Sequence, residues 1–448
     1  MLYGGEKMAF SKTLAEMEQN IPESDARKRL AAFFDDGRFS ELDKFLSADG
    51  EISTVVTGFG SVLGTSVYVF AQDGSVKGGA VNKNAAFKIA RIYDLAAKSG
   101  APVVGFFDSK GGEISEGMAV LAAYGDIMKA SAAVSGVVPQ IAVVTGVCAG
   151  CAAMLAEMAD ITVMTEEAEL FLTSPFNTPD GKLEGAGKAC AAAKSGVADI
   201  IVKNADEAVE TAKRLVAILP ENNMGFGYAD GYSENDAAIS ASMKGADVIA
   251  ALADKDSVVE LGAKFGSAAY TALANLRCGT AALIATDKAE KLTADDAAKI
   301  ARFVQLADLF SIPVVTVIGT DGFEGSSAAE FAGSVRECSK LAQVYASATT
   351  VKVNLIIGNA FGAAFAALNS ADITYAWENA KIAPMSPEAG KVFMGEELVV
   401  NPFAAASEGM IDGVIAPEDT REAIESALDI CTNKRVASPA RKRPNIAF

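Results

Sequence analysis

One local pattern occurs twice in the 448-residue chain, and it restricts the possible folds more than any other feature. Residues Ile141–Thr145 have the apolar composition of a short buried strand, and a glycine turn and a small-residue helix start follow them. Val353–Ile357 leads into the same arrangement. The first glycines of the two turns, Gly146 and Gly358, are 212 residues apart. The pattern therefore indicates two related halves.

Further matches at nearly the same offset support a duplication. They recur 211 or 212 residues apart: Lys88–Arg91 with Lys299–Arg302, Pro102–Val104 with Pro313–Val315, Asp160–Thr162 with Asp372–Thr374, and Ser174–Pro175 with Ser386–Pro387. A solenoid repeats every 20–50 residues or so, so a repeat this long indicates a duplicated domain. Strand–turn–helix units in both halves predict an α/β architecture.

The pattern of elements suggests four segments. Residues 1–50 read as a helical leader, 51–219 as the first half, 220–256 as a polar bridge, and 257–448 as the second half. Within the first half, Lys182–Leu219 has a helical pattern rich in small residues.

Composition excludes several classes of function. A formal net charge of −18 argues against nucleic acid or an anionic membrane as partner. The stretch Ala130–Ala156 is apolar, but Pro139 and glycines interrupt it, so a buried core is expected rather than a membrane span. Met1–Phe10 has no apolar core of a signal peptide, and the expected location is the cytoplasm.

The chain contains no histidine, which excludes histidine-based triads, histidine metal sites and histidine general bases. Its six cysteines are scattered, and Cys148 and Cys151 form a C-x-x-C without a second pair to complete a zinc site. We expect no metal. Chemistry must use carboxylates, lysine, cysteine, tyrosine, backbone dipoles or a cofactor that a partner brings.

The repeated turns themselves have two interpretations. A strand that feeds a glycine turn and a helix start leaves backbone N–H groups unpaired at a point of positive potential, and such a point can bind an oxyanion. Alternatively, the glycines only allow helices to pack closely on strands. The turns alone leave both interpretations open.

A combination of motifs along the chain identifies a family. The sequence resembles the carboxyltransferase subunits of biotin-dependent acyl-CoA carboxylases and decarboxylases, such as propionyl-CoA carboxylase beta chains. The segments that carry the resemblance are Ala26–Leu30, Asp36–Phe39, Val56–Gly60, Val69–Asp73, Gly78–Ala80, Asp108–Gly117, Ser135–Ile141, Gly146–Ala152, Asn401–Ala405, Gly409–Asp412 and Arg441–Ile446.

The resemblance implies a tandem duplicated crotonase-like fold, the ClpP/crotonase ββα superhelix. The first half would bind the acyl-CoA, and the second half would bind the carboxybiotin of a biotin carboxyl carrier protein. The site would lie between the first half of one subunit and the second half of another, so a dimer is the minimum and a hexamer is expected. A biotin carboxylase or a membrane decarboxylase subunit would be a further partner, without direct membrane insertion by this chain.

The resemblance also implies roles for individual residues. The N–H groups of Gly150 and Cys151 would stabilise a thioester enolate, and those of Ala363 and Ala364 would stabilise the ureido oxygen of biotin. The biotin anion would remove the α-proton, so the protein needs no base of its own. The implied cofactor-binding residues are Gly78, Gly79, Ala80, Gly111, Gly112, Gly322, Phe323 and Gly362.

Three departures from the family pattern keep alternatives open. The family has glycine where Cys151 and Ala363 stand, and Glu113–Ile114 replace its Ala-Arg pair. The chain could therefore be a catalytically weakened scaffold subunit of such a complex. A third reading is a crotonase-type acyl-CoA enzyme that works without biotin, which needs a carboxylate beside the oxyanion hole. Glu157 is the candidate, although its spacing from Gly150 is more typical of a helix-face residue.

Overall fold

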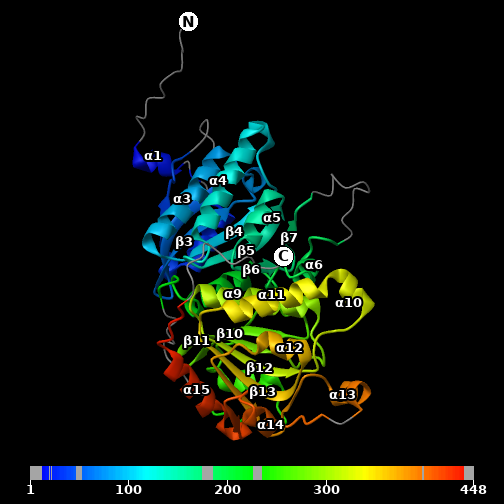
Figure 1. The fold of residues 1–448 in the computed structure, drawn as a ribbon. Coiled ribbons are helices and arrows are strands. Elements are labelled where there is room, and N and C mark those ends of the chain that lie inside the picture. The colour runs from blue at the N-terminus through cyan, green and yellow to red at the C-terminus, as the bar shows by residue number, and fades with distance from the viewer. Residues whose placement is uncertain are drawn as a thin grey trace.

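The computed structural model describes residues 13–437 except 20, 22, 47–52, 174–184, 226–234 and 396–397. The start of the predicted leader, the Ser174–Pro175 member of the repeat, and the Arg441–Ile446 motif lie outside the described residues. Two sheets of eight strands each make up the molecule, one in the upper and one in the lower part of Figure 1.

The first sheet has the order β1-β2-β3-β4-β5-β6-β8, and β7 pairs with β5 beside this path. β1 to β3 are antiparallel, and the later neighbours are parallel. The strands are β1 (Phe39–Leu42), β2 (Val55–Val62), β3 (Thr65–Gln72), β4 (Val103–Ser109), β5 (Gln140–Ala149), β6 (Ile161–Thr165), β7 (Glu169–Phe171) and β8 (Ile200–Val202). The helices are α1 (Leu14–Gln19), α2 (Asp25–Phe33), α3 (Lys83–Ser99), α4 (Ala119–Val134), α5 (Cys151–Glu157), α6 (Ala189–Lys194) and α7 (Ala205–Ile218).

The second sheet repeats this topology, with the order β16-β14-β13-β12-β11-β10-β9 and with β15 paired to β13. Its strands are β9 (Val259–Glu260), β10 (Tyr270–Leu276), β11 (Gly279–Ala285), β12 (Val314–Thr320), β13 (Lys352–Phe361), β14 (Ile373–Trp377), β15 (Lys381–Ala383) and β16 (Gly413–Ile415). The helices are α8 (Gly245–Leu252), α9 (Ala294–Leu309), α10 (Ser327–Ala332), α11 (Ser334–Ser347), α12 (Gly362–Leu368), α13 (Pro387–Met394), α14 (Pro402–Ser407) and α15 (Thr420–Cys431).

Strand pairing confirms the duplication at residue level. Val147–Ala149 of β5 pairs in parallel with Glu169–Phe171, and Asn359–Phe361 of β13 pairs in parallel with Lys381–Ala383. Both strands of the second pair lie 212 residues after those of the first. The α/β fold with duplicated crotonase-like domains is therefore the fold of this chain. One local prediction is wrong, because β8 lies inside the stretch 182–219 that reads as helical.

The repeated Lys-Ile-Ala-Arg motif has a structural cause in both halves. Lys88 is buried on α3 and donates to the Val55 carbonyl at 2.7 Å. Lys299 is buried on α9 and donates to the Ala269 carbonyl at 2.8 Å and the Gly266 carbonyl at 3.2 Å. Burial lowers the pKa of each lysine to about 8. Each lysine thus ties its helix to neighbouring backbone.

The two halves share one hydrophobic core. Helices α9 and α11 lie across the middle of the molecule between the two sheets (Figure 1). Buried side chains from both halves form a single cluster that includes Leu30, Phe33, Phe106, Leu215, Leu273 and Phe303. In the described part of the chain, no helix is both long enough and apolar enough to cross a membrane.

Candidate active site

The first repeated turn joins β5 to α5. Gly150 has φ 61° and ψ −123°, a conformation that favours glycine. Its N–H donates to the Phe171 carbonyl of β7 at 2.9 Å. The prediction that the Gly150 N–H binds an oxyanion is therefore wrong, because strand β7 already accepts that hydrogen bond. Gly150 instead shapes the turn.

Cys151 is the first residue of α5, and its N–H remains available. The first hydrogen bond of the helix runs from the Met154 N–H to the Gly150 carbonyl at 3.2 Å. The N–H groups of the first helical turn therefore lack acceptors within the helix. Among the described residues, no other acceptor is recorded for the Cys151 N–H. The oxyanion donor on this side is thus assigned to Cys151 as a prediction.

Two glycine loops meet next to this turn. The loop that holds Gly78, Gly79 and Ala80 is joined to the loop that holds Gly111 and Gly112 by backbone hydrogen bonds. The Lys110 N–H donates to the Gly78 carbonyl at 2.9 Å, and the Val81 N–H donates to the Gly111 carbonyl at 2.9 Å. A Cβ at Gly79 would lie 1.9 Å from the Asp108 carbonyl oxygen, so only glycine fits there. All five predicted residues of these loops are brought together.

The loops also touch the turn at α5. A Cβ built on Gly111 would lie 3.7 Å from the Ala149 carbonyl oxygen, which immediately precedes Gly150. The second half repeats this contact, since a Cβ built on Gly322 would lie 3.8 Å from the Phe361 carbonyl oxygen. The duplication therefore extends to the geometry of the two sites.

The second turn opens into a cavity of about 980 Å³. Four predicted residues line it: Gly322, Phe323, Gly362 and Ala363. Gly362 has φ 60° and starts α12, so the N–H groups of Ala363 and Ala364 have no acceptor within the helix. Ala363 is exposed, whereas the side chain of Ala364 is fully buried. The structure thus brings the second set of predicted residues together around one cavity.

Comparison with known proteins decides the family. A carboxyl transferase domain model matches residues 23–394. The chain belongs to the carboxyl transferase family. The methylmalonyl-CoA decarboxylase subunit alpha of Propionigenium modestum is 33% identical over 94% of this chain and 92% of its own length. A putative propionyl-CoA carboxylase beta chain of Bacillus subtilis is 34% identical over 94% of this chain and 93% of its own length.

A solved structure agrees with the sequence comparison. The crystal structure of transcarboxylase 12S, a hexamer assembly solved with methylmalonyl-coenzyme A and methylmalonic acid bound, has a TM-score of 0.89 and 29% sequence identity. The match covers 94% of this chain and 92% of the other. These matches confirm the predicted enzyme class, a carboxyltransferase that uses biotin and a CoA ester. The assignments of individual site residues remain predictions.

Two hydroxyl groups of this carboxyltransferase hold the glycine loops and were not among the predicted site residues. Ser109 Oγ accepts from the Gly111 N–H at 3.1 Å, and Thr320 Oγ1 accepts from the Gly322 N–H at 3.2 Å. Both side chains are buried. They occupy corresponding positions, 211 residues apart, so the repeat offset was the signal that could have identified them.

Glu113, which departs from the family pattern, does not leave an unpaired charge in the carboxyltransferase site. Its carboxylate lies 3.1 Å from Lys77 Nζ and accepts from Ser115 Oγ at 3.1 Å and Asn82 Nδ2 at 3.3 Å. The hydrogen bond from Lys77 lowers the pKa of Glu113. Glu113 thus links the Lys77–Gly79 turn to the start of α3.

We expect Glu113→Gln to lower the free energy of unfolding at neutral pH by less than about 1 kcal/mol, because Lys77 is 40% exposed and solvent screens the pair. The folded-state pKa lies below the ordinary value of 4.5, so the contribution is present above pH 4.5 and is lost as the pH falls through the folded pKa. Urea unfolding across acidic pH should show the difference shrink. A constant difference would indicate disturbed packing instead.

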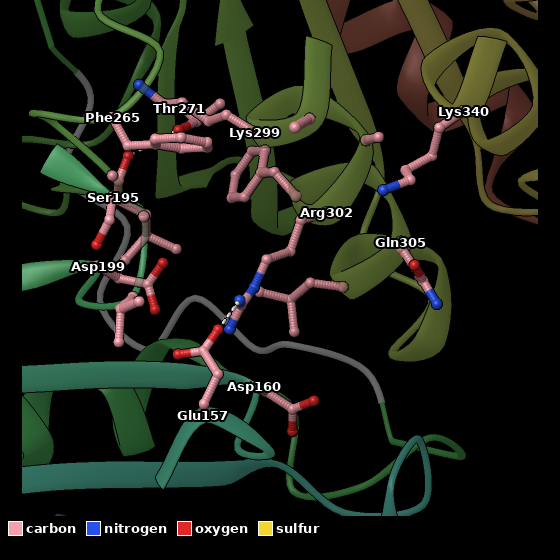
Figure 2. Close-up of a pocket in the computed structure, with 18 residues that line it drawn as sticks. Glu157, Asp160, Ser195, Asp199, Phe265, Thr271, Lys299, Arg302, Gln305 and Lys340 are labelled. Carbon is pink, nitrogen blue, oxygen red and sulfur yellow. Dashed lines mark hydrogen bonds and ion pairs between the residues drawn. The ribbon is translucent and has the colours of Figure 1, made fainter. Parts of the chain in front are cut away.

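Glu157, the carboxylate of the biotin-independent reading, lies away from the turn. It is the last residue of α5, and its Oε1 accepts from Arg302 Nη1 at 2.6 Å (Figure 2). Burial raises its pKa, while Arg302 opposes that effect. Because the α5 turn lies at the opposite end of the helix, Glu157 is not placed to act as a base beside Cys151.

The C-x-x-C residues contribute no metal site among the described residues. No group of three or more cysteine or acidic side chains in the described part of the chain could hold a metal ion. Cys148 is buried at the end of β5, and burial raises its pKa. A buried thiol that resists ionisation is a packing residue rather than a nucleophile.

Proposed function

We propose that this carboxyltransferase moves a carboxyl group between biotin on a carrier protein and a methylmalonyl- or propionyl-type acyl-CoA. The observation that carries this proposal is the pair of equivalent helix starts, each with unpaired backbone N–H groups beside a glycine loop. Two reacting molecules that both develop negative oxygen need two such sites. The acyl groups come from relatives named for methylmalonyl-CoA and propionyl-CoA.

The first half is proposed to hold the acyl-CoA. The Cys151 N–H would donate to the thioester oxygen as the enolate forms, and the loops at Gly78–Ala80 and Gly111–Gly112 would contact the CoA ester. An apolar pocket of about 650 Å³ runs along α5, and Ala153, Met154, Met158, Leu170 and Leu172 contribute to its lining. An apolar lining suits a short acyl group and excludes water from the enolate.

The second half is proposed to hold biotin. When bound, biotin supplies the carboxyl group and the base that takes the α-proton. The cavity of about 980 Å³ has room for its fused rings, and the ureido oxygen is an acceptor that suits the Ala363 and Ala364 N–H groups. Gly322, Phe323 and Gly362 would line the rings. These alanines differ from glycine only by a Cβ, so the backbone donors survive.

The assembly is proposed to pair the first half of one subunit with the second half of another. Exposed apolar side chains near both turns support this arrangement, and they are Met118, Leu121, Met154 and Leu172 in the first half and Phe331, Val335, Val392 and Phe393 in the second. Large exposed apolar groups commonly mark protein interfaces. We propose a hexamer, after the transcarboxylase 12S assembly. A biotin carboxyl carrier protein and a biotin carboxylase or membrane decarboxylase subunit are the proposed partners, in the cytoplasm.

Carboxyl exchange tests the proposal. The purified protein, free biotin or a biotinylated carrier, and methylmalonyl-CoA labelled in its free carboxylate should yield labelled carboxybiotin. Failure with malonyl-, methylmalonyl- and glutaconyl-CoA would contradict it. If only the double variant Cys151→Gly, Ala363→Gly transfers label, the chain is the scaffold subunit instead. Activity on an enoyl-CoA without biotin would favour the third reading.

A further inference from the structure

One ion pair connects the two halves at the end of the helix that carries the first oxyanion donor. Glu157 closes α5 in the first half, and Arg302 extends from α9 in the second half. Their charged atoms lie 2.6 Å apart at the edge of a cavity of about 460 Å³ between the halves (Figure 2). Glu157 Oε2 is buried and accepts no hydrogen bond from the described residues.

The surrounding charges make Arg302 the link between the halves. Besides Glu157, the first half contributes the carboxylates of Asp160 and Asp199, whereas the second half contributes Lys299 and Lys340. Burial lowers the pKa of Arg302, but Asp199, Glu157 and Asp160 together raise it above its ordinary value. The guanidinium therefore remains charged while it bridges to α5.

The duplicated copy shows that the fold does not require this bridge. Arg91, in the first copy of the Lys-Ile-Ala-Arg motif, pairs with Asp43 of its own half. Arg302, in the second copy, pairs across the boundary instead. Both arginines are about equally exposed, at 41% and 42% of the side chain. The same helix position thus stabilises one half locally and connects the other half to α5.

Helix α5 has few other anchors. It has seven residues, so it is about 10 Å long. Its buried residues are Ala152, Ala153, Leu155 and Ala156, which offer only one large side chain to fix its orientation. A contact at its last residue therefore determines how its first residue is aimed. A positive charge beside this end also offsets the carboxylate of Glu157, which opposes the helix dipole.

We propose that the Glu157–Arg302 pair is a positioning contact through which the second half orients α5 and aims the Cys151 N–H in the acyl-CoA site of the same subunit. This inference rests on the proposed function. The Cys151 N–H bonds most strongly to the enolate oxygen, which is fully negative only after proton removal. Misalignment therefore lowers kcat and leaves the KM for acyl-CoA nearly unchanged.

Kinetics of four variants test the pair. Arg302→Met should lower kcat about tenfold or more, with the KM for acyl-CoA changed less than about twofold. Arg302→Lys should restore most of kcat because it keeps the charge. Glu157→Gln should resemble Arg302→Met, and the double variant should be no slower than the slower single variant. Arg91→Met is the matched control, since it breaks the equivalent pair and should leave kcat unchanged.

Hydrogen exchange tests the orientation of α5 without relying on turnover. In Arg302→Met, the amides of Met154–Glu157 should exchange faster than in the wild type, whereas Arg91→Met should leave them unchanged. Equal kcat in Arg302→Met and Arg91→Met, or unchanged exchange in α5, would overturn the positioning role. If the wild type transfers no carboxyl group, the proposed function fails, and the exchange of α5 alone decides whether the pair orients the helix.

Discussion

Cys151→Pro should lower the kcat of carboxyl exchange roughly 100- to 1,000-fold, the usual cost of removing one oxyanion donor. Proline has no N–H, and the first position of a helix is where proline fits without loss of an internal hydrogen bond. Cys151 occupies that position in α5. The residue before it is glycine, which reduces the clash that proline causes with a preceding Cβ. The substitution therefore removes one backbone donor and little else.

A control separates the donor from the side chain at this position. Cys151→Ala keeps the N–H and should retain kcat within about twofold, because only the thiol is lost. Circular dichroism and thermal unfolding would show that both variants fold. If Cys151→Pro folds and retains wild-type kcat, the Cys151 N–H is not the oxyanion donor. That result would matter more because the Gly150 N–H is already bonded to Phe171.

Ala363→Pro should lower exchange by about 100-fold or more through the biotin side of the reaction. Ala363 is the second residue of α12, where its N–H has no acceptor within the helix, and it lines the large cavity of the second half. The expected loss is in kcat with the carrier or free biotin, while the affinity for acyl-CoA stays at the wild-type value.

The matched control is Ala363→Gly, which restores the family residue and keeps the donor. We expect exchange at or above the wild-type rate, since the approach to the cavity widens. Acyl-CoA affinity, measured by calorimetry on both variants, locates the defect. If Ala363→Pro weakens acyl-CoA binding and spares the reaction with biotin, the assignment of the two halves is reversed.

Family and duplicated fold were readable from the sequence because both depend on local patterns. The strand–turn–helix units at Gly146 and Gly358 recur at one offset, and every residue of a β5- or β13-like turn lies within a few positions of the next. Glycine loops at 78–80 and 111–112 were also found in this way, since close approach of backbones demands glycine wherever it occurs. The structure then joined the loops, as the repeat in the second half led us to expect.

Contacts between distant segments could not be read in the same way. The sequence specified a helix start at Gly150 and Cys151 but not which of the two N–H groups stays free. That depends on β7, which follows about twenty residues later and accepts the Gly150 hydrogen bond. Likewise, Glu157 has the same local signature whether it faces solvent, substrate or Arg302. Only the packing of α9 beside α5, across 145 residues of sequence, decided that it forms the bridge between the halves.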